Sequence, residues 1–417
     1  MTGIARDPDF RRFWGGLTVS KLGSSVATVV TPLIAVQVLH GGALTVSLLT
    51  AAAWLPWLLI GLPAGAWVDR VAKRPVLLAC DATSALLVAS VPVAAWLGRL
   101  TLVHLLAVAL LTGVAAVFFD VAQTGYLPAM FDTDQLVQAN ALTHGSNSAT
   151  QIAGPALGGA LAAATGVVTG LVIDAASFAV SFLGVALIRR PERRVTHAPR
   201  KHLGHEIRAG IRWLLHEPYL RNLMLHGAAA NLALTGYTAL SVVFLVRDVG
   251  VDTGVVGLLL SSAGLGGVAA AGAAPFLTRR FGAARAMVTC KVGAGLSALL
   301  IPFAGLWLGV VPFIAGTGLG AAFVVAGNVI VGGFRQAYVP AELLGRVLTA
   351  MQFVNFGTIP VGAVLGGALA TTYGTRTAIG VMTVTHALTG LILLLGPFRT
   401  RRDLPAPVSG TALSTVR

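Results

Sequence analysis

The sequence predicts an all-α membrane protein with twelve transmembrane helices in two homologous six-helix bundles. Hydrophobic residues make up 56% of the 417 residues and charged residues only 11%, well below the roughly one quarter that is typical of soluble domains. Apolar runs of roughly 20 residues, the length that crosses a bilayer as a helix, recur along the chain. The second half of the chain also repeats features of the first half. These three observations together predict the fold.

The apolar runs give twelve predicted spans. They cover residues 13–38, 44–68, 75–97, 100–127, 139–164 and 167–188 in the first half, and 222–246, 253–277, 286–305, 306–333, 347–372 and 376–396 in the second. The runs are continuous and lack the alternating polarity of barrel strands. Because backbone groups in hydrocarbon must be paired within the segment, each run is predicted to be a helix.

The basic residues that give the net charge of +14 are distributed according to the predicted membrane topology. Of the 29 Lys and Arg residues, all but five fall on one side of the predicted membrane; the exceptions are Arg99, Arg247 and Arg376 on the other side, and Lys21 and Lys291 within spans. This positive-inside pattern predicts a multi-pass protein of the cell inner (cytoplasmic) membrane with both termini cytoplasmic. It also excludes nucleic acid as the partner that the basic charge would otherwise suggest.

An internal duplication sets the domain boundaries. Residues 7–12 (DPDFRR) are echoed by residues 217–222 (EPYLRN), an offset of 210, and Cys80-Asp81 is echoed by Cys290-Lys291 at the same offset. Two parallel repeats of this kind place a transport site between the halves near the membrane midplane. We therefore predict a bundle at 1–188, a cytoplasmic linker with a short amphipathic helix at 189–217, a second bundle at 218–398 and a disordered cytoplasmic tail at 399–417.

A short basic loop follows the second predicted span. Its residues Gly65, Asp69, Arg70, Lys73 and Arg74 resemble the G-x-x-x-D-R-x-x-x-R signature of the major facilitator superfamily. The resemblance implies a gating loop, in which the carboxylate sits at the positive N-terminus of a neighbouring helix. In the family that helix is the one that begins here near residues 342–346. The alternative is a plain solvated loop, and Ala72 departs from the family's glycine.

The fifth span carries a glycine pattern made of Gly145, Gly154, Pro155, Gly158 and Gly159. It resembles the signature of the drug–proton antiporters within the same superfamily. The resemblance implies a smooth helix face that packs against the other half, and it implies export.

Longer runs resemble one group of the superfamily, the macrolide-efflux and siderophore-exporter (transmembrane secretion effector) group. They are residues 118–122 (FFDVA), 126–128 (YLP), 173–178 (IDAASF), 342–347 (ELLGRV) and 357–362 (GTIPVG). The resemblance implies a secondary active transporter that exports an amphiphilic small molecule, such as a drug, an antibiotic or another secondary metabolite, by alternating access and proton antiport. Three alternatives stay open: a siderophore exporter, a nutrient importer of the same fold, and a non-transporting membrane sensor or accessory subunit.

Three intramembrane carboxylates are candidates for proton coupling, because charges within a bilayer are costly and mark functional sites. Asp120 is preferred, since low dielectric favours the neutral form of a carboxyl group and so links its protonation to conformation. Asp81 and Asp174 are the other two candidates. Asp81 lies near a helix end and either pairs with its repeat counterpart Lys291 across the interface of the halves or snorkels toward water, and snorkelling is the preferred expectation. Lys21 pairs with an acidic group, attracts an anionic substrate or snorkels toward water; the sequence leaves all three open. The fourth-span arginine of many drug–proton antiporters is absent, with Leu110 in its place.

Polar side chains within the spans are the candidates for a substrate cavity. They are Lys21, Gln123, Asn147, Gln151, Asn231, Asn328, Gln352 and Asn355; for any single one of the amides, hydrogen bonding between helices is the competing interpretation. The sequence has no Walker loop, nucleophile elbow or zinc-type histidine pair. We therefore expect no enzyme activity, cofactor or metal, and as partners only a small-molecule substrate, protons and membrane lipid around a monomer.

Overall fold

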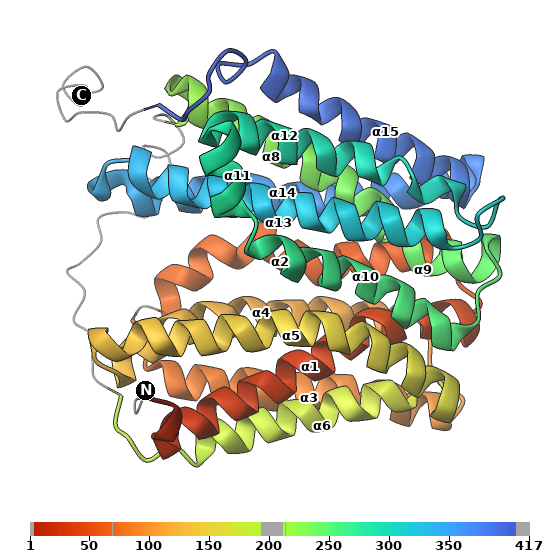
Figure 1. Cartoon of the computed structure of the whole chain (residues 1–417). Coiled ribbons are helices and arrows are strands. Elements are labelled where there is room, and N and C mark those ends of the chain that lie inside the picture. The colour runs from red at the N-terminus through yellow and green to blue at the C-terminus, as the bar shows by residue number, and fades with distance from the viewer. Residues whose placement is uncertain (1–3, 69, 193–211, 213, 406–417) are drawn as a thin grey trace. The chain divides into compact units, whose positions relative to one another are not determined.

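The computed structural model describes residues 4–68, 70–192, 212 and 214–405. Within these residues the chain is helical and forms no strand, apart from one isolated bridge between Leu306 and Gly309. Its contacts divide the chain into two compact units (Figure 1). The first unit comprises residues 1–198 and 239–261, and the second comprises residues 199–238 and 262–417.

Six long helices build the first unit. They are α1 (Pro8–Gln37), α2 (Ala43–Val68), α3 (Lys73–Trp96), α4 (Leu102–Met130), α5 (Thr133–Thr165) and α6 (Thr169–Ala186), preceded by a short 3-10 turn at Ile4–Arg6. The unit also holds α9 (Ser241–Val243), the π-helical turn Phe244–Asp248 and the first part of α10 (Thr253–Ala271). Helix α1 packs against α5 and α6, and α3 packs against α4 and α6.

The second unit repeats this arrangement. It holds α8 (Pro218–Thr238), the end of α10, α11 (Ala274–Phe281), α12 (Ala283–Ala298), a 3-10 turn at Ile301–Phe303, α13 (Val311–Tyr338), α14 (Ala341–Tyr373) and α15 (Thr375–Leu394). Helix α8 packs against α14 and α15, and α12 packs against α13 and α15. These are the pairs of the first unit in the same chain order, so the duplication seen in the sequence is also a duplication of packing.

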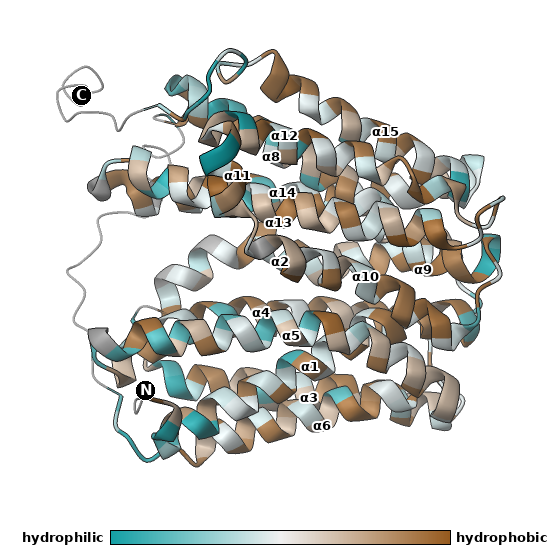
Figure 2. Cartoon of the chain, viewed as in Figure 1, coloured by the Kyte–Doolittle hydropathy of each residue, from teal (hydrophilic) through white to brown (hydrophobic). Residues whose placement is uncertain are grey.

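The helices suit a bilayer. Among the described residues, eleven helices are long and apolar enough to cross a membrane. Helix α5 is not one of them, because its first half is rich in Gln, Asn, Ser and Thr. Large apolar side chains such as Leu86 and Leu183 are more than half exposed on the helices, as lipid-facing residues must be. Figure 2 shows the apolar colouring along the helices, with hydrophilic residues gathered mainly at their ends. The predicted helical membrane fold is confirmed.

Four predicted spans differ from the observed helices. The span at 222–246 is interrupted after Thr238, and the span at 286–305 ends as an α-helix at Ala298. The span predicted at 253–277 is broken after Ala271, and α11 starts at Ala274 with a proline in its first turn, since proline has no backbone N–H to continue the preceding helix. The span predicted at 306–333 begins instead at Val311. The preceding loop needs left-handed backbone at Gly305 (φ 78°) and Gly309 (φ 55°), which glycine adopts without steric cost.

The linker and the C-terminal tail lie only partly within the described residues. The amphipathic helix predicted in the linker 189–217 lies outside the described residues, which omit 193–211 and 213. Of the predicted tail 399–417, residues 399–405 are described and reach the start of α12, where the Arg402 carbonyl accepts from the N–H of Ala284 at 3.1 Å. Residues 406–417 lie outside the described part of the chain.

Candidate functional site

A polar pocket lies within the first unit, between α1, α4 and α5. It encloses about 320 Å³, a volume at the lower end of the range of small-molecule sites. Its lining residues are Leu17, Thr18 and Lys21 of α1, Asp120, Gln123 and Thr124 of α4, and Thr143, His144, Ser146 and Asn147 of α5. The polar first half of α5 therefore lines this pocket, which explains why this helix is less apolar than its neighbours.

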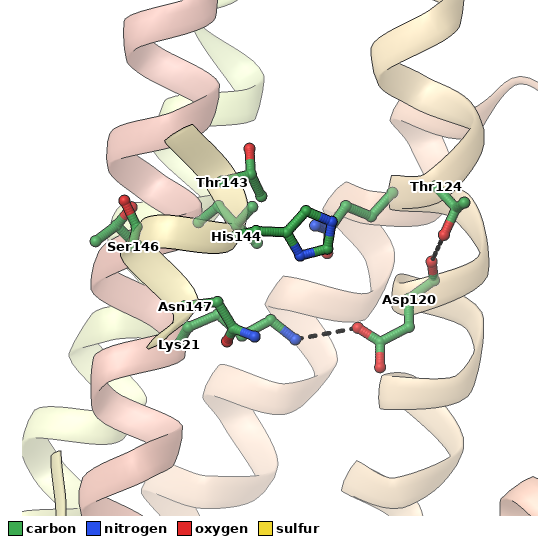
Figure 3. A pocket seen from close by; sticks show the side chains of 10 residues that line it. Lys21, Asp120, Thr124, Thr143, His144, Ser146 and Asn147 are labelled. Atoms are coloured by element: carbon green, nitrogen blue, oxygen red, sulfur yellow. Dashed lines mark hydrogen bonds and ion pairs between the residues drawn. The ribbon is translucent and has the colours of Figure 1, made fainter. Parts of the chain in front are cut away.

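The pocket contains an ion pair between α1 and α4 (Figure 3). The Lys21 Nζ lies 3.1 Å from the Asp120 Oδ1, and the two side chains are 35% and 39% exposed. The Asp120 carbonyl also accepts a hydrogen bond from the Thr124 hydroxyl at 2.7 Å. Because both charged groups remain partly exposed, water or a ligand can reach them without prior unfolding of a helix.

The depth of this pair follows from helix geometry. Lys21 lies 13 residues after the start of α1, and Asp120 lies 10 residues before the end of α4. At 1.5 Å per residue these positions are about 20 Å and 15 Å from one end of the bundle, close to the middle of a hydrocarbon core about 30 Å thick. Two further ion pairs, Arg12–Asp9 and Arg190–Asp7, lie at that end of the bundle.

The sequence-based candidates divide into two groups around this pocket. The structure brings together Lys21, Asp120, Gln123 and Asn147, all of which line it. It leaves Gln151 exposed on α5, outside the lining. His144 lines the pocket as well, although the sequence offered no reason to choose it over the other histidines.

The two other carboxylates do not line the pocket. Asp81 is 1% exposed and accepts a hydrogen bond from the Ser181 hydroxyl of α6 at 2.7 Å. Asp174 is 3% exposed and lies beside Gly23 of α1, where an added Cβ would come within 2.9 Å of the carboxylate. The expectation that Asp81 snorkels toward water is wrong, because the hydroxyl on the neighbouring helix gives the carboxylate a buried partner.

Four of the predicted cavity residues belong to the second unit. Asn328 of α13 accepts a hydrogen bond from the Lys291 Nζ at 2.6 Å. Asn355 of α14 lies next to Gly227 of α8 and has a buried Oδ1 with no hydrogen-bond partner in the structure. Asn231 is half-buried on α8, and Gln352 is exposed on α14.

The basic loop between α2 and α3 is described only in part, since Asp69 lies outside the described residues. Gly65 is the fourth residue from the end of α2, and Arg70 is exposed. Arg74 donates to the carbonyl of Ala186 at 2.8 Å, which ties the start of α3 to the end of α6. The predicted role of this loop as a gate stays a prediction.

Sequence reasoning missed the residue that caps α3. The Glu192 carboxylate accepts from the backbone N–H groups of Lys73 and Arg74 at 2.8 and 3.2 Å, so a negative charge sits at the positive end of the helix. In the second unit Asp403 accepts from the N–H of Ala283, at the start of α12, at 3.2 Å. Because α12 repeats α3, comparing the residues that follow the last helix of each half would have revealed this pair of caps.

The glycines of α5 allow close helix contacts. A Cβ added at Gly154 would come within 3.0 Å of the backbone of Ser25 in α1, and one at Gly158 within 2.9 Å of the Val26 carbonyl. A Cβ at Gly159 would come within 2.8 Å of the backbone of Gly257 in α10. A Cβ at Gly145, by contrast, would meet open space.

Comparisons with known proteins agree with this architecture. A family model described as "Transmembrane secretion effector" matches residues 4–406. The chain is 28% identical to the multidrug efflux pump Tap of Mycolicibacterium fortuitum, over 97% of this chain and 99% of that protein. It is 25% identical to the enterobactin exporter EntS of Salmonella typhi, over 87% and 85%. The fold is similar to a crystal structure of a bacterial homologue of the iron transporter ferroportin in an inward-facing state, with a TM-score of 0.76 at 17% identity and coverage of 94% and 99%.

Proposed function

Because the chain belongs to the transmembrane secretion effector family of the major facilitator superfamily, a family of membrane transporters and not of enzymes, we propose that it exports amphiphilic small molecules in exchange for protons. The proposed cargo class is a drug, an antibiotic or another secondary metabolite. The similarity to a multidrug efflux pump over nearly the whole length of both chains supports export. We also propose that both termini face the cytoplasm, on the basis of the positive-inside pattern, and that the transporter works as a monomer.

The observation that carries the proton-coupling part of this proposal is the Lys21–Asp120 pair. The Asp120 carboxylate can hold either a proton or the Lys21 ammonium as its ionic partner. Protonation of Asp120 therefore breaks the link between α1 and α4, and loss of the proton restores it. A transporter that alternates its access can use such a switch, because the proton is taken from one side of the membrane and released to the other.

Protonation of Asp120 also affects the polar side chains that line the pocket beside it. When Asp120 is protonated, Lys21 no longer has an ionic partner, and the amides of Gln123 and Asn147 can redistribute their hydrogen bonds within the pocket. Substrate and proton then compete for one set of polar groups. This competition is the physical basis of exchange, since the site binds one of them at the expense of the other.

The direct test is gradient-driven transport by the Asp120→Asn variant. Cells that lack their own efflux pumps would express the wild type or the variant, and susceptibility to a panel of amphiphilic drugs would be scored. Drugs to which the wild type confers resistance would then be followed in inverted vesicles with an imposed proton gradient. We expect Asp120→Asn to abolish proton-driven transport while substrate binding persists.

The control is a matched substitution far from the pocket. Asp248→Asn removes an exposed carboxylate from the turn that follows α9 and should leave transport unchanged. Undiminished gradient-driven transport in Asp120→Asn would remove Asp120 from the mechanism. Movement of the same drugs into the cytoplasm with wild-type protein would favour the importer alternative, and binding without any flux would favour a sensor.

Siderophore export is the second candidate function. The similarity to the enterobactin exporter of Salmonella typhi supports it. The two candidates separate in one experiment, in which a siderophore-producing strain without its own exporter is complemented with this chain. Secretion of the siderophore without any change in drug susceptibility would select the second candidate.

A further inference from the structure

The second unit holds two cationic side chains with no carboxylate partner among the side chains that the structure describes. Lys291 of α12 donates to the neutral Asn328 amide at 2.6 Å. Arg335 of α13 has a buried Nε with no hydrogen-bond partner, and it lies two turns along α13 from Asn328. We name Lys291, Asn328 and Arg335 the cationic cluster.

The described carboxylates of this unit are engaged elsewhere. Glu217 accepts from the Tyr338 hydroxyl at 2.7 Å, and Asp403 caps α12. A cation within a span is costly unless an anion compensates it. Lys291 lies eight residues, about 12 Å, inside α12, and Arg335 lies in the last turn of α13. Within the side chains that the structure describes, the second unit supplies no such anion.

The cluster lies along one face of α13. Asn328 and Arg335 are seven residues apart, which places them on the same side of a helix two turns, or about 10.5 Å, from each other. Lys291 reaches this face because Gly327 has no side chain; a Cβ there would come within 3.2 Å of the lysine Cε. Asn328 is exposed, and both cations are partly exposed. A ligand can therefore reach all three groups.

The duplication supports a binding role for this face. The run that starts at Tyr126 in α4 returns at Tyr338 in α13, an offset of 212. The same offset relates Gln123, which lines the polar pocket of the first unit, to Arg335. The arginine thus occupies, in the second unit, the helical position that faces the ligand-sized pocket in the first.

We infer that the cationic cluster is a subsite for an anionic group of the transported molecule. A carboxylate, sulfonate or phosphate would accept from the Arg335 guanidinium and the Lys291 ammonium, and the Asn328 amide holds Lys291 in position. The inference rests on the proposed function, and it narrows the cargo to amphiphiles that carry an acidic group. A lipid headgroup phosphate has the same chemistry, so the experiment must separate the two sources.

The probe pair is 8-anilinonaphthalene-1-sulfonate and its uncharged parent, N-phenyl-1-naphthylamine. Binding of each would be followed by fluorescence with purified full-length protein in a neutral detergent without anionic lipid. We expect Arg335→Gln and Lys291→Gln to weaken binding of the sulfonate about tenfold or more and to change binding of the uncharged probe less than about twofold. Arg335→Lys should recover part of the affinity, and Arg279→Gln, which removes an exposed cation from α11, should behave as wild type.

The uncharged probe also reports on folding, since a misfolded variant exposes apolar surface and would change the binding of both probes. Equal losses for the two probes, or sulfonate binding that survives in both Gln variants, would overturn the inference. Adding phosphatidylglycerol tests the lipid source: full displacement of the sulfonate at low lipid content would assign the cluster to headgroups and overturn a cargo site. The proposed function fails separately, if proteoliposomes show no flux even though the probe discrimination is present.

Discussion

Neutralising the ion pair of the first unit should abolish coupling at little cost in stability. At a separation of 3.1 Å, two unit charges attract by about 1.3 kcal/mol in bulk water and by about 5 kcal/mol at an effective dielectric constant of 20. Side chains that are 35% and 39% exposed lie toward the aqueous limit, and holding two long side chains in one geometry costs entropy. The net value should be about 1 kcal/mol or less.

The measurement is a double-mutant cycle on Lys21→Met and Asp120→Asn. Thermal unfolding of the purified proteins in detergent should show each single variant within about 4 °C of the wild type. Gradient-driven transport should fall at least tenfold in each single variant, and the double variant should be no worse than either, because residues that act as one unit are not additive.

The charge swap provides the control. Lys21→Asp combined with Asp120→Lys restores opposite charges at the same two positions, whereas either reversal alone creates like charges. We expect the double reversal to recover thermal stability relative to both single reversals. A loss of about 10 °C or more for Lys21→Met would refute the reasoning, since it would mean that the pair acts as a buried structural bridge. Wild-type coupling in Lys21→Met would refute the proposed switch.

Three further predictions concern other parts of the first unit. Glu192→Gln should lower thermal stability by about 1 kcal/mol, because it weakens the charged cap on α3; an unchanged melting temperature would contradict the assigned cap. Gly159→Ala should destabilise the protein and reduce transport, because its Cβ meets backbone atoms of α10, whereas Gly145→Ala meets open space and should be tolerated in the same assays. Asp81→Asn should retain more than half of the transport activity, since its amide oxygen can still accept from Ser181, and a full loss of proton-driven flux would make Asp81 a coupling residue.

The fold could be predicted from sequence because its causes are local or repeated. Each span is recognisable from its own composition, and the repeated Tyr126 and Tyr338 runs give the register of the two halves. The errors arise where backbone conformation overrides hydropathy. Residues 272–273 and 304–310 are as apolar as the helices beside them, and only Pro275 and the left-handed glycines mark the breaks.

The site could be predicted only one residue at a time. Lys21 and Asp120 each stand out as a charge within an apolar run, but they are 99 residues apart in the chain, and only the packing of the helices shows that they form a pair. Asp81 also stands out as a charge within an apolar run, but its environment differs. Its hydrogen-bond partner Ser181 lies on α6, 100 residues away in the chain, so the sequence alone does not reveal the contact. The cap residue Glu192 gave no signal by itself, since it stands in a charged segment where any residue could be solvated.

The two units agree at their ends and differ in their interiors. Acidic caps stand at the start of α3 and of α12, and an arginine lies over an aromatic ring in both units, with Arg190 over Phe131 at 4.9 Å and Arg401 over Tyr219 at 5.3 Å. Each of these contacts joins the segment after the last helix of a unit to one end of another helix of the same unit.

The corresponding interior positions of the two units carry different side chains. Asp81 corresponds to Lys291 at an offset of 210, and Gln123 corresponds to Arg335 at an offset of 212. At these positions the first unit carries one carboxylate and one neutral amide, and the second unit carries two cations. A duplicated scaffold with opposite interior charges can assign the proton to one half and an acidic cargo to the other. Loss of the anion preference in Arg335→Gln with intact proton coupling, and the reverse in Asp120→Asn, would be the signature of that division.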